Sequence, residues 1–284
     1  DLDAGAWPQA RERLIALRQM GAHEAAVALV LADLAAFDAR LETAVQDLER
    51  AWQRTGDPRL AARRAELLLA QDRPEDARAV LDEALARSSS ADSSDLLLAD
   101  GDWYRLAGQG DEALARYRTG LARAQGRTQQ ADALGRLGRA LQERGDLAAA
   151  RDALASAVSL DPRSADLLGA EATAATEAFR LREADAEFDA ALALQGDDYE
   201  SLAGAGFLAL RRGQPEAARQ LLLKALVIEP RYARAQVWLA VAEYTLGAEG
   251  AALDALQRAR QADPKDPLPW QIESILRNDS GESE

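Results

Sequence analysis

The feature that most constrains the fold is a pattern that recurs about every 34 residues along almost the whole chain. In each unit an alanine is followed, four positions later, by a large apolar side chain. The spacings between successive alanines are 34, 33, 36, 37, 34, 34 and 34 residues. Units of this length cannot bury an apolar face alone, so they are expected to stack on their neighbours. The pairs are Ala10/Leu14, Ala44/Leu48, Ala77/Leu81, Ala113/Tyr117, Ala150/Leu154, Ala184/Phe188, Ala218/Leu222 and Ala252/Leu256.

Small residues and helix breakers recur in phase with the alanines and predict two helices in every unit. Gly101, Gly138 and Gly206 fall midway along the predicted first helices, where the missing side chain lets a second helix approach closely. Glycines such as Gly108 lie between the two helices and supply a left-handed turn, after which Asp111 is expected to cap the second helix. Prolines, which cannot continue a helix, close three units: Pro162, Pro230 and Pro264.

This combination resembles the tetratricopeptide repeat, a 34-residue unit with a small residue in its first helix, an alanine in its second helix and a final proline. The resemblance implies an all-α fold, a right-handed α-solenoid of antiparallel helix pairs. It also implies one domain with these parts: a single solenoid over residues 1–277, a lone helix at 7–20, helix pairs over 23–264, a partial repeat at 267–277 and a disordered tail at 278–284.

Two positions depart from the family pattern, because Asp72 and Phe179 stand where a glycine is expected between the helices. The incomplete units at the two ends predict that the chain is a fragment of a longer protein, or a solenoid capped by single helices.

Composition argues against several classes of function. The formal net charge is −14, so the chain is expected to be repelled by nucleic-acid phosphates and by anionic membrane surfaces. It has no cysteine, which excludes disulfides, thiolate metal sites and cysteine nucleophiles. Its one histidine, His23, has no metal-ligating partners at helical spacing, and no apolar run near the start of the chain approaches the length that spans a bilayer. Because no catalytic motif is present, we expect no enzymatic activity and no cofactor. The isolated histidine and the short apolar runs further predict no metal and no direct membrane insertion.

The family resemblance points to the concave groove as the place for a binding site, since positions 2, 5, 9 and 12 of each first helix line that groove in the family. In this chain these positions and their neighbours form a charged middle region with Arg105, Arg136 and Arg139. They also form an apolar C-terminal region with Phe207, Leu210, Val237, Val241 and Tyr244. The other groove positions are Arg59, Ala62, Glu66, Leu69, Asp95, Leu98, Asp102, Asp132, Gly135, Gln142, Asp166, Gly169, Thr173, Thr176, Glu200, Ala203 and Arg234.

A peptide with acidic residues and an apolar anchor suits such a groove, because arginine forks bind carboxylates and aromatic side chains are efficient anchors. In the alternative interpretation, the arginines only solvate the surface and the apolar end faces a further repeat.

The function that these patterns predict is a protein-interaction scaffold that binds a peptide or a partner domain in its groove. One alternative is a self-assembly module, in which the Trp270 end of one copy stacks on the Trp7 end of another. A second alternative is the regulatory arm of an enzyme whose catalytic domain lies outside this chain. Residues 262–270 resemble a junction in bacterial cell-envelope proteins, which favours the periplasm or cell envelope over the cytoplasm.

Overall fold

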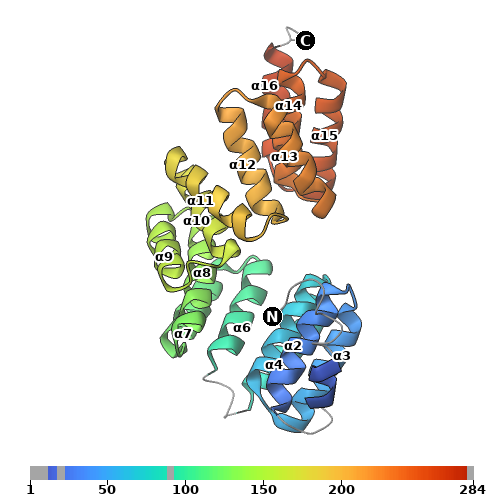
Figure 1. The fold of residues 1–284 in the computed structure, drawn as a ribbon, viewed down its shortest axis with the longest axis vertical. Coiled ribbons are helices and arrows are strands. Elements are labelled where there is room, and N and C mark those ends of the chain that lie inside the picture. The colour runs from blue at the N-terminus through green and yellow to red at the C-terminus, as the bar shows by residue number, and fades with distance from the viewer. Residues whose placement is uncertain (1–11, 18–22, 88–92, 280–284) are drawn as a thin grey trace. The chain divides into compact units, whose positions relative to one another are not determined.

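A computed structural model describes residues 12–17, 23–87 and 93–279, and its regular structure there is α-helical, without strands (Figure 1). The predicted helix at 7–20 lies outside the described residues except for 12–17, which are helical. Residues 280–284 of the predicted tail lie outside them too, whereas residues 278 and 279 belong to the last helix and are not disordered. The helices are α2 (Glu24–Phe37), α3 (Leu41–Thr55), α4 (Pro58–Ala70), α5 (Pro74–Leu85), α6 (Ser94–Leu106), α7 (Gly110–Arg123), α8 (Arg127–Glu143), α9 (Leu147–Leu160), α10 (Ala165–Glu177), α11 (Leu181–Leu194), α12 (Tyr199–Arg211), α13 (Pro215–Ile228), α14 (Ala233–Thr245), α15 (Glu249–Ala262) and α16 (Leu268–Asp279).

The chain divides into two compact units, Asp1–Asp146 and Leu147–Glu284. The helix pairs α2–α3, α4–α5 and α6–α7 pack together in the first unit, as do α10–α11, α12–α13 and α14–α15 in the second. First helices also contact one another, in one row of α2, α4, α6 and α8 and another of α10, α12, α14 and α16. Each unit is therefore a stack of helix pairs, which confirms the expected all-α solenoid. The single solenoid over residues 1–277 stays a prediction.

The small residues of the repeat lie where the two helices of a pair cross. Tyr117 is fully buried, and a Cβ added at Gly101 would lie 2.5 Å from a carbon of its ring. A Cβ added at Gly206 would lie 2.8 Å from Cγ of Leu222, which is also fully buried. Carbon atoms in contact normally lie about 3.5–4.0 Å apart. Glycine at these crossings therefore makes room for the large side chain that follows each alanine.

The turn between paired helices has the same backbone geometry with and without glycine. Gly108 has a positive φ of 75°, and Asp72 and Phe179 adopt 58° and 60°. After Phe179, the amide of Arg180 donates to the carbonyl of Ala175 at 2.8 Å, which closes a Schellman motif. The two departures from the sequence pattern thus keep the family turn, at a cost of about 1–2 kcal/mol for each left-handed non-glycine residue.

Side-chain N-caps occur on four of the described first helices. Asp57, Ser93, Ser164 and Asp198 each accept a hydrogen bond from an amide in the first turn of α4, α6, α10 and α12. The expected cap at Asp111 is wrong, because α7 begins at Gly110 and its N-cap is Gln109, whose side chain makes no capping bond. Asp111 instead forms an ion pair with Arg144 of the same unit.

Candidate functional site

The charged region predicted from the sequence contains Arg136, whose guanidinium group is neutralised by acids of the chain itself. Its Nη2 lies 2.8 Å from the carboxylate of Glu66, its Nε lies 3.1 Å from that of Asp132, and its Nη1 pairs with Asp102. Asp102 also accepts a hydrogen bond from the Tyr117 hydroxyl at 2.7 Å. Because Glu66, Asp102 and Arg136 belong to α4, α6 and α8, this arginine links three successive first helices of the first unit.

Burial governs the protonation of this network. It raises the pKa of the Tyr117 phenol, which keeps the proton that the hydroxyl donates to Asp102. Burial also raises the pKa of the Asp102 carboxyl, and the charge of Arg136 opposes that rise. Burial disfavours the charged form of Arg136, but Asp102 and Glu66 outweigh it and raise the pKa of the guanidinium. The arginine therefore stays charged and its charge is satisfied within the fold.

The other two predicted arginines do not extend this region into an open cationic surface. Arg105 donates to the carboxylate of Glu143 at 2.9 Å. Arg105 and Glu143 line a cavity of about 360 Å³. Asp111 and Arg144 line the same cavity and form a second ion pair. Arg139 is half-buried on α8. The structure thus places the charged residues near one another but pairs Arg105 and Arg136 internally.

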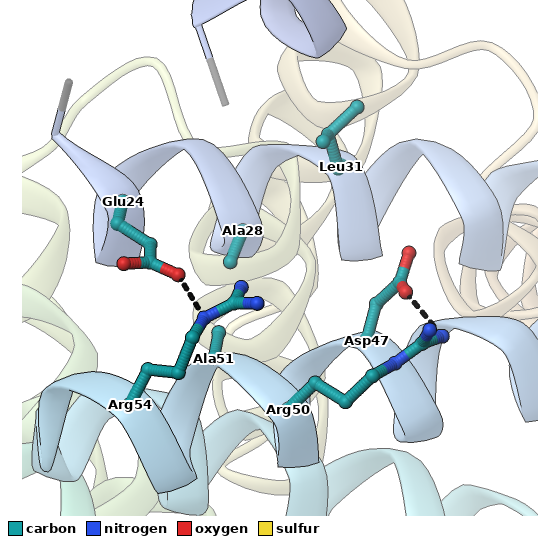
Figure 2. Close-up of a pocket in the computed structure, with 7 residues that line it drawn as sticks. All are labelled: Glu24, Ala28, Leu31, Asp47, Arg50, Ala51 and Arg54. Carbon is teal, nitrogen blue, oxygen red and sulfur yellow. Dashed lines mark hydrogen bonds and ion pairs between the residues drawn. The ribbon is translucent and has the colours of Figure 1, made fainter. Parts of the chain in front are cut away.

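A second hollow of the first unit lies between α2 and α3 and has a volume of about 450 Å³ (Figure 2). Arg54 of α3 reaches across to Glu24 of α2, and Arg50 pairs with Asp47 at 2.7 Å within α3. The remaining lining residues are small or aliphatic: Ala28, Leu31 and Ala51. This hollow has no aromatic side chain among its lining residues, and both of its arginines are paired.

The apolar region of the second unit is different, because aromatic side chains surround a cavity of about 310 Å³ there. Five rings line it, and the Phe179 side chain at its edge is 81% exposed. The rings of Phe207 and Trp238 meet with their centroids 4.6 Å apart. The lining residues are Thr173, Thr176, Glu177, Phe179, Phe188, Glu200, Ala203, Gly204, Phe207, Tyr232, Arg234, Trp238 and Leu268.

Helical spacing brings most of these residues to one cavity. Ala203 and Phe207 lie one turn apart on α12, and Arg234 and Trp238 do so on α14. Phe188 reaches the cavity from α11, beneath Gly204 of α12. A Cβ added at Gly204 would lie 2.1 Å from Cζ of Phe188, so the missing side chain makes room for the ring.

The structure separates the predicted apolar residues into three groups. Phe207 lines the cavity, whereas Leu210 and Tyr244 are half-buried against the core of the second unit. Val241 is half-buried as well. Val237 was wrongly expected at the groove surface, because its exposed fraction is 0%. Position 5 is buried in the six first helices from α4 to α14: Ala62, Leu98, Gly135, Gly169, Ala203 and Val237.

Sequence reasoning missed four of the five rings as site residues. Trp238 follows a groove position directly, so a wider window on α14 would have found it. Phe179 was noted only as a departure from glycine, although an aromatic residue in a left-handed turn is itself an unusual feature. Phe188 was assigned to the core pattern, and it is 2% exposed while also forming cavity wall. Tyr232 precedes α14 and has no signal in the repeat.

The described residues contain no group of three or more histidine, cysteine or acidic side chains arranged to hold a metal ion. None of their helices combines the length and the apolar character that a bilayer crossing requires.

Comparisons with known proteins agree with this architecture. A family model described as a tetratricopeptide repeat matches residues 101–165 and 205–267. No curated protein matches the sequence. Among solved structures, a chain of the APC/C hetero-tetramer Cut9-Hcn1 has a TM-score of 0.65 at 14% identity. That match covers 95% of this chain, which spans only 59% of the length of the Cut9-Hcn1 chain.

Two bacterial structures are also similar. A tetratricopeptide repeat protein from Parabacteroides merdae has a TM-score of 0.59 at 14% identity, and the match covers 90% of this chain and 99% of that one. The pilF protein of Pseudomonas aeruginosa has a TM-score of 0.58 at 16% identity, with 78% and 98% covered. At such identities the likeness concerns the fold alone. The family model, the helix-pair stack and the shared fold together show that this chain contains tetratricopeptide repeats.

Proposed function

We propose that this protein binds an extended segment of a partner protein along the first helices of its second unit, with one side chain anchored in the aromatic cavity. The fold is that of a protein-interaction scaffold, and it is typical of proteins without catalytic activity. The observation that carries the proposal is the cavity of about 310 Å³ with its five aromatic rings. Aromatic pockets that desolvate one inserted side chain supply most of the binding energy in many interfaces.

The construction of the cavity supports an anchoring role. Its floor is rigid, because Phe188 of α11 is 2% exposed and its ring packs against Gly204 of α12. Its edge is open, because the Phe179 ring projects into solvent. A preformed floor reduces the entropy lost on binding, and an exposed ring gains when a partner covers it.

The proposal changes the ligand predicted from the sequence. An acidic peptide was expected because arginines were expected to be available in the groove. Arg105 and Arg136 instead pair with Glu143, Glu66, Asp102 and Asp132. A carboxylate of a partner would have to displace acids that are already in place, so we propose the cavity alone as the anchor site.

A random peptide library displayed on phage and selected against the full chain tests this proposal. The key variant is Phe179→Asn, because asparagine tolerates a positive φ and removes only the exposed ring. Phe207→Ala is the second variant, with its helix content checked by circular dichroism. The matched control is Val227→Asn on α13, which also replaces an exposed apolar side chain of the same unit.

We expect the wild type and Val227→Asn to enrich the same peptides, and both cavity variants to lose them. The proposal fails when no peptide is enriched, or when the cavity variants retain every enriched peptide.

Self-assembly is a second candidate, favoured by the exposure of Trp270 and Ile275 on α16. The opposite end of that predicted contact, Trp7, lies outside the described residues. Light scattering at two concentrations tests the idea: a mass that rises with concentration and falls in Trp270→Ala supports it, and a constant monomer removes it. The regulatory-arm alternative stays a prediction about sequence beyond this chain.

A further inference from the structure

We propose, on the basis of the proposed function, that the side chain which enters the aromatic cavity of the second unit is an arginine of the partner protein. Four features of the described residues point to a guanidinium group: the aromatic walls, the way this chain uses its other tryptophans, an unpaired glutamate in the lining and the position of the one arginine there.

The walls of the cavity suit a planar cation. Aromatic rings carry negative charge on their faces and attract cations within about 6 Å. Five rings line this cavity, and Phe207 and Trp238 meet at an interplanar angle of 45°. A pair of rings inclined in this way forms a wedge that a flat guanidinium group can enter with a face against one ring.

Most tryptophans in the described part of this chain are covered by an arginine of the chain itself. Arginine guanidinium groups lie over the rings of three of the four described tryptophans. The distances to the ring centroids are 4.3 Å for Arg87 over Trp52, 4.9 Å for Arg78 over Trp103 and 4.2 Å for Arg260 over Trp270. Trp238 is the fourth, and no arginine in the described part of the chain covers its ring. Among the described tryptophans, Trp238 in the cavity is therefore the one whose ring is not covered by an arginine of this chain.

The charges of the lining favour a cation over an anion. Glu177 of α10 is half-buried, and its side-chain carboxylate makes no hydrogen bond and no ion pair within the described residues. A partly desolvated carboxylate without a cation is unfavourable, and an arginine fork satisfies it with two hydrogen bonds. Glu200 adds a second carboxylate to the lining. Arg234 lines the same cavity, but its side chain is exposed, so water already satisfies its charge.

Arginine fits these features better than lysine or an aliphatic residue. Its guanidinium group is weakly hydrated and stacks on aromatic faces, whereas the ammonium group of lysine is compact and strongly hydrated. An aliphatic side chain would fill the cavity but would leave the Glu177 carboxylate without a partner.

The test uses four peptides of the form acetyl-Gly-Ser-X-Ser-Gly-amide, in which X is arginine, citrulline, leucine or glutamate. Citrulline has nearly the shape of arginine but no charge. Binding to the full chain is followed by the NMR shift of the Trp238 indole N–H. We expect the arginine peptide to bind about 5- to 30-fold more tightly than the citrulline peptide, the range that cation–π attraction and one partly exposed ion pair allow.

Two glutamate variants locate the effect. Glu177→Gln is expected to reduce the preference for arginine over citrulline to about 3-fold or less, leaving the leucine peptide unaffected. The matched control is Glu216→Gln on α13, an exposed glutamate outside the cavity lining, and it is expected to leave the preference unchanged.

The outcomes separate this inference from the proposed function. If leucine binds as tightly as arginine, or if glutamate binds most tightly through Arg234, the arginine inference is overturned while the cavity remains a binding site. If no peptide shifts Trp238, the arginine inference is also overturned, and the library selection against Phe179→Asn decides the proposed function separately.

Discussion

Arg136 provides the most direct test of how the first unit is held together. In Arg136→Ala the guanidinium group that joins α4, α6 and α8 is removed, and Glu66 and Asp102 lose their shared cation. The arginine side chain is 23% exposed, and those of Glu66 and Asp102 are 21% and 19% exposed. Asp132 is 48% exposed, so its bond to Arg136 contributes little.

The magnitude follows from the two inner contacts. A hydrogen bond to a charged group contributes about 1.5–3 kcal/mol, and breaking a fully buried ion pair costs about 3–5 kcal/mol. Since the two carboxylates are about one-fifth exposed, water recovers part of that loss after the truncation. We therefore expect Arg136→Ala to lower the free energy of unfolding by about 2–4 kcal/mol.

The assay is urea unfolding of the full chain, followed by circular dichroism. Arg136→Lys is expected to recover only part of the loss, because an ammonium group cannot reproduce the fork that reaches two carboxylates. The control is Arg118→Ala on α7, since Arg118 is exposed and pairs with no acid among the described residues. If Arg136→Ala unfolds at the same urea concentration as the wild type, Arg136 is not a structural link. It then returns as a candidate for partner binding.

Three further predictions concern the repeat and its charges. Gly206→Leu is expected to lower stability by about 1–3 kcal/mol, because its first side-chain carbon would lie 2.8 Å from Cγ of the buried Leu222; an unchanged melting temperature would contradict this. Asp72→Gly is expected to raise stability by about 0.5–1 kcal/mol by relieving the left-handed backbone, and a lower melting temperature would count against the turn strain. Burial, reinforced by the charges of Glu171 and Glu183, raises the pKa of Glu187 from 4.5 to about 7. The folded state then binds this proton more tightly than the unfolded state, so stability falls as pH rises from about 4.5 to about 7. Glu187→Gln should therefore lose less stability than the wild type between pH 5 and 8, and parallel pH profiles would refute the shift.

The repeat architecture could be predicted from the sequence because local rules dictate it. Alanine at a helix crossing, a large residue one turn later and glycine at the turn are each recognisable without tertiary information, and they occur at one period. The same rules failed for Asp111, because the turn before α7 places the cap at Gln109, two residues earlier than the aspartate. Such a shift depends on how the preceding helix ends.

The candidate site was only partly predictable, because helical periodicity says which face a residue occupies but not what covers that face. Phe207 was found because it lies at a groove position of α12. Val237 has an equally favourable position in the sequence, yet the packing of neighbouring first helices buries it completely. The arginines illustrate the same difficulty with charge, since nothing local reveals that Glu66, 70 residues before Arg136, pairs with it.

The repeat, the all-α class and the turns between helices can be read along the chain, since they arise from contacts within about 34 residues. Which charges pair and which aromatic rings share a cavity is set only in the folded protein. Those choices depend on side chains from different repeats, and their mutual distances exist only after the helix pairs have stacked.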